Sequence, residues 1–131
     1  MEQLENLIER RTEIVFPHET NAYGTLFGGK ALSMMDVVAG ILGMRACRKQ
    51  VVTASIDRID FKEPIHAGEF VETIARIAKV GRTSLTIEVE LWAEDPLTGR
   101  RRLSTVGRFI MVAVGPDGRP TPVRDEIKQA V

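Results

Sequence analysis

Few residues of this chain can bind a metal ion or form a disulfide. The 131 residues include one cysteine, Cys47, and two histidines, His18 and His66. One cysteine excludes a disulfide within the chain and fits a reducing compartment. The three residues are too few and too scattered for a metal centre, so we expect none.

An excess charge and a long apolar run are also absent. Lys and Arg number 18, and so do Asp and Glu, so the whole chain gives no electrostatic reason to bind nucleic acid. No apolar run approaches the ~20 residues of a membrane helix, and the acidic start lacks the apolar core of a signal peptide. We expect a soluble cytoplasmic protein that binds neither nucleic acid nor membranes.

The length suits a single domain over residues 1–131, with an ordered core over about 12–115 and a polar tail over 116–131. Residues 29–47 predict a helix that is apolar nearly all round and therefore buried, and residues 2–11 predict a short amphipathic turn or a frayed arm. Strands are expected over residues 12–16, 51–62, 70–80, 83–94 and 100–114.

Short turns between the four long strands favour antiparallel neighbours. The predicted architecture is therefore α+β, with a curved antiparallel sheet wrapped around one central helix. One sheet on one helix leaves sheet edges and outer strand faces uncovered. Oligomerisation is the expected remedy.

A single charge interrupts the predicted buried helix. A carboxylate at Asp36 is costly to bury, so it is either a structural acceptor of hydrogen bonds or a group used chemically, such as a general base. The helix also carries a stripe of small or polar residues at helical spacing, which indicates close approach of backbone or ligand. The stripe consists of Ser33, Asp36, Gly40, Gly43 and Cys47.

The loop before this helix carries an amide side chain and bare backbone N–H groups. Gly28 and Gly29 stand where the helix begins, and N–H groups there lack intrahelical partners. These N–H groups either donate to a carbonyl oxygen that gains charge, with Gly29 as the first candidate for the oxyanion donor, or the two glycines merely make the turn. Asn21 either orients water or carbonyl, or holds the loop as an Asx turn. Together with Asp36, these groups look like parts of an acyl-transfer site.

Residues 17–29, PHETNAYGTLFGG, followed by Met35-Asp36, resemble the hotdog-fold acyl-CoA thioesterases of the cytosolic acyl-CoA hydrolase branch. Residues 52–55, 61–65 and 79–84 agree with this family too, so the resemblance covers about residues 12–115. It implies a hotdog fold, dimers joined edge to edge, often hexamers of three dimers, and hydrolysis of acyl-CoA to free acid and CoA without a metal. CoA is part of substrate and product, so no separate cofactor is expected. Many relatives carry an acidic residue nearer position 18, so His18 receives no role.

The CoA phosphates need cations and amides. Gly81, Arg82, Thr83 and Ser84 supply a tight turn, a guanidinium and two hydroxyls, and the resemblance places CoA contacts there too; the alternative is a β-turn with a polar edge. The run 100–102 of three arginines ranks second for phosphate and otherwise reads as a solvated strand end. Phe61 and Pro64 are candidates to line the pantetheine path, or else they pack in the core. Trp92, on the polar side of its strand, is a candidate for a subunit interface.

Asp36 lies seven residues beyond Gly29, roughly 10 Å along the helix axis. One carbonyl cannot easily touch both in one chain, so we expect a homodimer, within a tetramer or hexamer, that brings Asp36 of one subunit toward Asn21 and Gly29 of the other. Asp36 then activates water, or attacks to form an anhydride. Two alternatives stay open: a non-catalytic acyl-CoA sensor, which would lose Asp36, and a hotdog hydratase of enoyl-thioesters, which would need a histidine in the site.

Overall fold

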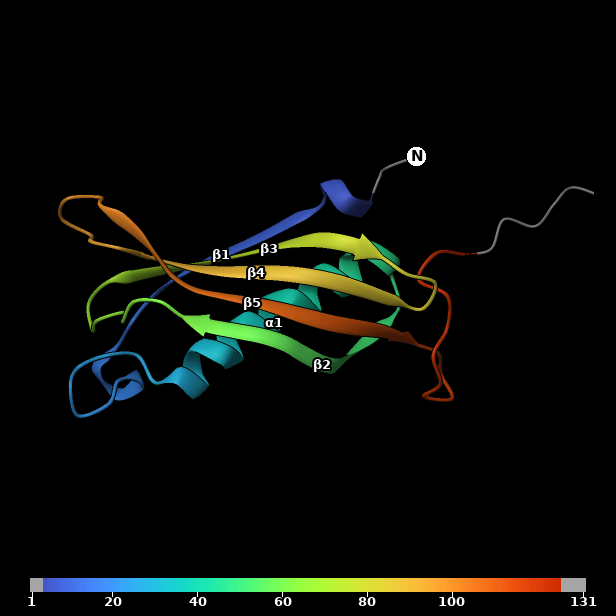
Figure 1. Ribbon diagram of the computed structural model, residues 1–131, viewed down its shortest axis with the longest axis horizontal. Coiled ribbons are helices and arrows are strands. Elements are labelled where there is room, and N and C mark those ends of the chain that lie inside the picture. Colours follow the sequence, from blue (N-terminus) through green and yellow to red (C-terminus); the bar gives the residue numbers. More distant parts are fainter. Residues whose placement is uncertain (1–3, 126–131) are drawn as a thin grey trace, which may run out of the picture.

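The computed structural model describes residues 4–125, so the last part of the predicted tail, residues 126–131, lies outside the described residues (Figure 1). A five-stranded antiparallel sheet lies across one long helix, which confirms the expected α+β architecture. The elements in chain order are η1 (Leu4–Asn6), β1 (Ile8–Ile14), η2 (Pro17–Glu19), α1 (Gly28–Cys47), β2 (Gln50–Phe61), β3 (Phe70–Val80), β4 (Ser84–Glu94) and β5 (Arg101–Val114).

The strand order is β1-β3-β4-β5-β2, with every pairing antiparallel. Tight turns join β3, β4 and β5 as neighbours, but β2 pairs with β5 and not with β3, so the simple order expected from short turns is wrong at this point. The connection over residues 62–69 spans up to about 26 Å when extended. Strands three positions apart are separated by about 14 Å. The connection is therefore long enough to cross the end of the sheet, and β2 becomes an edge.

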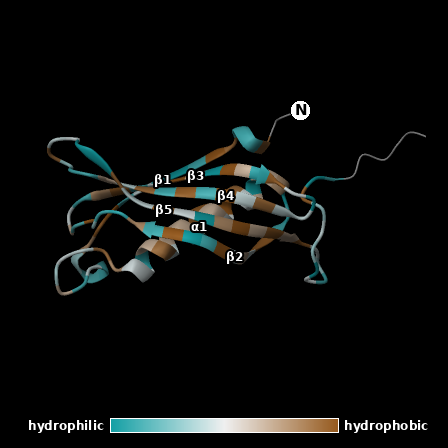
Figure 2. Ribbon diagram, in the orientation of Figure 1, coloured by the Kyte–Doolittle hydropathy of each residue, from teal (hydrophilic) through white to brown (hydrophobic). Residues whose placement is uncertain are grey.

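Alternation along the strands builds the core between the sheet and α1. In β4 the predicted apolar set is buried, and its alternate residues are half-buried or exposed; Figure 2 shows the same alternation of apolar and polar residues. Gly107 in β5 allows close packing here. A Cβ added to it would lie 2.5 Å from Ile59 Cδ1 and 2.9 Å from Met35 Cε, so a larger residue would push α1 and β2 away from β5.

Three local features differ from expectation. The first strand begins at Ile8 because residues 8–14 pair continuously with β3, so the predicted turn or frayed arm is partly strand. Packing also continues beyond residue 115: Val123 is buried in the core and its N–H donates to the carbonyl of Arg82 at 2.8 Å. The helix is not buried all round, because Val37 and Met44 are each 45% exposed in the single chain.

Candidate active site

Asp36 lies at the edge of α1 that faces β2, and it is half-buried instead of enclosed. The hydroxyl of Thr53 on β2 donates to Asp36 Oδ1 at 2.6 Å, and it also lies 3.3 Å from Met111 Sδ. Among the described residues, nothing donates a hydrogen bond to Asp36 Oδ2. The carboxylate thus has one oxygen fixed and one oxygen open to water or substrate.

The sequence assigned Thr53 no role. The signal available was its place in residues 52–55, one of the stretches that resemble the family. The structure adds a shift in the β2–β5 register directly after Thr53, between Thr53 and Ser55, and a second one between Ile56 and Arg58. Such irregularities redirect side chains beside functional sites, and they depend on pairing that the residue pattern of β2 alone does not reveal.

The predicted stripe of small residues divides into a packed half and an open half. Beside Gly43, the side chain of Val51 on β2 lies 3.2 Å from where a Cβ would be, so the strand packs closely there. Beside Gly40, no atom lies within 4 Å of that position, and Ser33 is exposed. The open half of the stripe includes Asp36 and faces away from the chain's own core.

Asn21 holds the loop before the helix. Its Oδ1 accepts hydrogen bonds from Tyr23 N at 2.9 Å, Thr25 N at 3.2 Å and Thr25 Oγ1 at 3.1 Å, which is the Asx-turn arrangement. Gly24 completes the turn with a φ of 76°, which favours glycine. Within residues 4–125 the side-chain nitrogen of Asn21 has no hydrogen-bond partner, so its two N–H donors stay available.

The first turn of α1 presents its N–H groups to the surface. Ala31 N is the first to donate within the helix, to Phe27 O at 2.9 Å, while Gly28 and Gly29 are exposed and have no acceptor in the described part of the chain. A pocket of about 300 Å³ opens here. The lining includes Gly28, Phe61 and Pro64, and a Cβ on Gly28 would lie 3.6 Å from Phe61 Cζ.

The single chain does not bring all the predicted site residues together. Asp36 is absent from the lining of the pocket at the helix start. The Gly81–Ser84 turn lies at the opposite end of the sheet from that start (Figure 1). In that turn Gly81 N donates to Ser84 O at 2.8 Å, and Ala113 N donates to Thr83 O at 2.9 Å. A second pocket, of about 370 Å³, is lined by Gly81 and Arg82 together with residues of the chain's C-terminal segment.

Apolar side chains remain exposed along β2 and the adjacent face of α1. Val52 is 50% exposed and Ile56 is 38% exposed on the strand, beside the exposed Val37 and Met44 on the helix. β2 is also an edge strand of twelve residues. A long edge with apolar residues is a surface that isolated proteins avoid.

The arginine run at the start of β5 is largely engaged. Arg101 binds Glu72 at 2.7 Å and lies 5.4 Å from the centre of the Trp92 ring, which gives the half-buried tryptophan a cation–π partner in its own chain. Arg102 pairs with Glu69 at 2.6 and 2.7 Å. Hence two of the three arginines ranked second for phosphate already have carboxylate partners.

Residues 4–125 contain neither a metal-binding cluster nor a membrane-spanning helix. No group of three or more His, Cys, Asp or Glu side chains is placed to hold a metal ion. The helices there are too short or too polar to cross a bilayer.

Residues 23–100 match the family model of the thioesterase superfamily. The chain belongs to this family. Acyl-CoA thioester hydrolase YciA of Salmonella typhimurium is 39% identical over 114 residues, which are 84% of this chain and 85% of that protein. An acyl-CoA thioester hydrolase of Bacillus subtilis, YkhA, is also 39% identical, over 86% of this chain and 66% of its own length. The family expected from the sequence is therefore confirmed.

Solved structures of thioesterase-superfamily members share the fold. An apo-hexameric acyl-CoA thioesterase aligns with a TM-score of 0.87 and 37% identity, over 93% of this chain and 80% of that one. An acyl-CoA hydrolase of Staphylococcus aureus, solved with butyryl coenzyme A and coenzyme A, aligns with a TM-score of 0.85 and 29% identity, over 92% and 76%. The hotdog fold predicted from the sequence is thereby confirmed. Alanine variants of the S. aureus enzyme at one aspartate, one asparagine and one threonine have also been solved.

Proposed function

We propose that this member of the thioesterase superfamily hydrolyses acyl-CoA thioesters to a free carboxylic acid and CoA, with Asp36 as the general base. The observation that carries the proposal is the Asp36 carboxylate, which is fixed through Oδ1 by Thr53 and leaves Oδ2 open at a half-exposed position. Asp36 is assigned as the base because an oriented carboxylate beside open space can take a proton from water.

The spacing of three residues supports this assignment. In the S. aureus acyl-CoA hydrolase, the aspartate replaced by alanine lies 15 residues after the replaced asparagine and 17 before the replaced threonine. Asn21, Asp36 and Thr53 have the same spacing in this chain. The correspondence includes Thr53, whose hydroxyl is the group that fixes Asp36.

Hydrolysis then proceeds by general-base catalysis. Asp36 Oδ2 takes a proton from water, whose oxygen attacks the thioester carbon, and the carbonyl oxygen becomes an oxyanion. The N–H of Gly29, at the positive end of α1, donates to that oxyanion, and one such donor is worth about 10²–10³ in kcat. When the C–S bond breaks, the thiolate of CoA leaves and takes up the proton. Direct attack by Asp36 to form an anhydride is the alternative route, and water would hydrolyse that intermediate.

The active site is composite in this proposal. Gly29 and Asp36 are separated by seven residues of helix, roughly 10 Å. Within the described part of a single chain, no contact joins Asn21 to Asp36. Pairing of β2 with β2 of a second copy around a two-fold axis covers the apolar residues Val52 and Ile56 and satisfies the free edge. It also brings Asp36 of one copy toward the loop and helix start of the other. The hexameric state of a solved relative is compatible with such a dimer as its unit.

The remaining substrate contacts follow the same division. Phe61 and Pro64 line the pocket at the helix start and take the pantetheine arm, while the Gly81–Ser84 turn with Arg82 takes CoA phosphate. Because this turn lies far from the helix start of its own chain, in this proposal it serves the site at the helix start of a different subunit. No cofactor beyond the CoA of the substrate enters this scheme.

A thiol-release assay over a panel of acyl-CoA chain lengths tests the proposal. The wild-type chain should release CoA, whereas Asp36→Asn should lose at least 10²-fold in kcat, because a general base contributes about 10²–10⁴-fold. Circular dichroism of Asp36→Asn should match that of the wild type. Full turnover by Asp36→Asn would overturn the role of Asp36, and binding of CoA without turnover by the wild type would indicate a sensor.

A further inference from the structure

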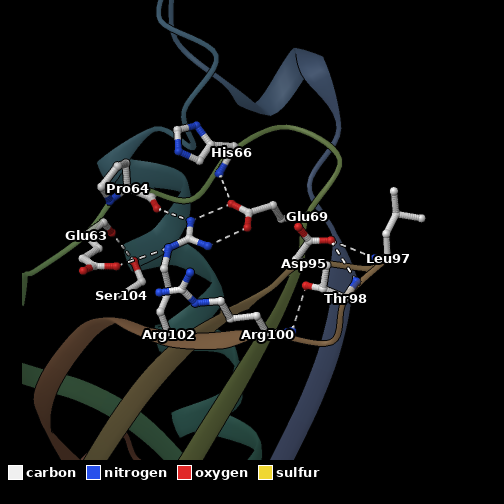
Figure 3. Close-up of polar contacts among 10 residues, drawn as sticks. All are labelled: Glu63, Pro64, His66, Glu69, Asp95, Leu97, Thr98, Arg100, Arg102 and Ser104. Atoms are coloured by element: carbon white, nitrogen blue, oxygen red, sulfur yellow. Dashed lines mark hydrogen bonds and ion pairs between the residues drawn. The ribbon is translucent and has the colours of Figure 1, made fainter.

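Arg102, at the start of β5, makes an unusually complete set of contacts for a residue near the surface (Figure 3). Nη1 and Nη2 bind the two carboxylate oxygens of Glu69 at 2.6 and 2.7 Å, in the bidentate geometry that only arginine provides. Nη2 also donates to the carbonyl oxygen of Pro64 at 2.8 Å, and Nε lies 3.3 Å from Glu63 Oε2. Its three partners all belong to the connection between β2 and β3.

That connection in turn holds the loop before the helix. Leu26 N donates to Ile65 O at 2.7 Å, and Ala67 N donates to Gly24 O at 3.0 Å. A β-bridge between Thr25 and the connection lies between these two hydrogen bonds. The loop from Asn21 to the helix start therefore rests on residues 65–67. Arg102 contacts the connection on both sides of these residues, at residues 63–64 and at Glu69, and Val15 and Ser104 add backbone hydrogen bonds.

We propose that Arg102 is a positioning residue of the active site: by fixing the 62–69 connection, it sets the loop that carries Asn21 and leads to Gly29, and with it the pocket at the helix start. The proposal rests on the function proposed above. It also lowers Arg102 among the candidates for CoA phosphate, because its guanidinium is already engaged by Glu63, Pro64 and Glu69.

Three observations separate this role from general packing. The connection contributes one buried apolar residue, Ile65, so the core alone does not determine the path of its other residues. Pro64, whose carbonyl binds Arg102, lines the pocket directly. The pair is also ionised over the neutral range: the hydrogen bonds from Arg102, followed by the backbone N–H of His66, lower the pKa of Glu69.

The test compares Arg102→Gln and Arg102→Lys with the matched control Arg119→Gln. The Arg119 side chain is exposed, has no hydrogen-bond or ion-pair partner among residues 4–125, and lines neither pocket of the proposed site, so the control removes the same charge away from that site. The kcat and KM of each variant for acyl-CoA are measured at a temperature below the unfolding temperature of that variant. Amide hydrogen exchange is followed at Leu26 and Ala67, with Val89 in the centre of the sheet as the internal reference.

Displacement of reacting groups by about 1 Å costs up to about 100-fold in rate. We therefore expect kcat to fall about 10- to 100-fold in Arg102→Gln, and to fall in Arg102→Lys as well because lysine lacks the fork. Arg119→Gln should stay within about twofold of the wild type, since changes at unpartnered surface residues are small. Exchange at Leu26 and Ala67 should accelerate in both Arg102 variants, with Val89 unchanged.

Each other outcome has a defined meaning. Unchanged exchange at Leu26 and Ala67 would overturn the anchoring role, whatever the activity. Faster exchange with unchanged kcat would overturn the positioning role. A uniform rise in exchange that includes Val89 would show a merely structural effect and would also overturn it. Failure of the wild type to release CoA, in contrast, would reject the proposed function itself, and the exchange data would still decide whether Arg102 anchors the loop.

Discussion

Replacing Thr53 with valine removes one hydrogen bond and keeps the branched shape of the side chain. The hydroxyl donates to Asp36 Oδ1 at 2.6 Å, so Thr53→Val releases the proposed general base from its only donor among residues 4–125. A hydrogen bond to a charged group contributes about 1.5–3 kcal/mol. Because Thr53 is exposed in the single chain, we take the lower end, which corresponds to about tenfold in rate.

The assay measures kcat and KM for CoA release by Thr53→Val, Thr53→Ser and Ser55→Ala. Serine keeps the hydroxyl and should retain most of the activity. Ser55 serves as the control, because it is exposed two positions further along β2 and its side chain has no hydrogen-bond partner within the described chain. The free energy of unfolding should fall by no more than about 1.5 kcal/mol in Thr53→Val, the contribution of the lost hydrogen bond, and should change by about 0.5 kcal/mol or less in Ser55→Ala. If Thr53→Val matches Ser55→Ala in kcat, the orientation of Asp36 by Thr53 has no part in the reaction.

Three further predictions follow from the site and its surroundings. Inactive Asp36→Ala and Asn21→Ala chains, unfolded together and refolded as a mixture, should regain about a quarter of the wild-type activity, because random pairing makes half of the dimers mixed and each mixed dimer has one intact site of two; no recovery would place the site within one chain. Ile56→Asp puts like charges near the two-fold axis, so size-exclusion chromatography with light scattering should show smaller particles without activity, and an intact active oligomer would argue against pairing through β2. Glu69, faced by Arg102, Glu63 and His66, has a pKa below its ordinary value. Its contribution to stability is therefore present above about pH 4.3 and is lost as the pH falls through its folded-state pKa. Between neutral pH and pH 3, Glu69→Gln should lose less unfolding free energy than the wild type.

The sequence predicted the fold well where patterns are local. The alternation in residues 84–94 and the long apolar helix define β4 and α1 nearly to the residue. The strand order was beyond that reasoning, because the crossing of residues 62–69 depends on distance in space and not on periodicity. The same crossing makes β2 an edge and so prepares the surface on which the oligomer is proposed to form.

The candidate site divides in the same way. The sequence alone identifies the residues whose chemistry does not suit their surroundings, which are Asp36, Asn21 and the glycines at the helix start. It does not identify Thr53 and Arg102, since a threonine in a strand and an arginine at a strand end are ordinary there. Their importance comes from their partners, Asp36 in one case and Glu69 in the other, which only the folded chain brings within reach.

The open half of the helix stripe connects these findings. A helix that packed against its own sheet on every side would bury Asp36 and leave no route for a substrate. Instead Val51 packs closely against Gly43, while the helix surface near Gly40 is bare and bordered by Val37, which is exposed. An apolar surface of this kind requires cover, and a second copy would enclose the space beside Asp36 in which substrate and the attacking water bind. The same association would then both stabilise the fold and complete the catalytic site, so a variant that blocks it should lose activity even where each chain remains folded.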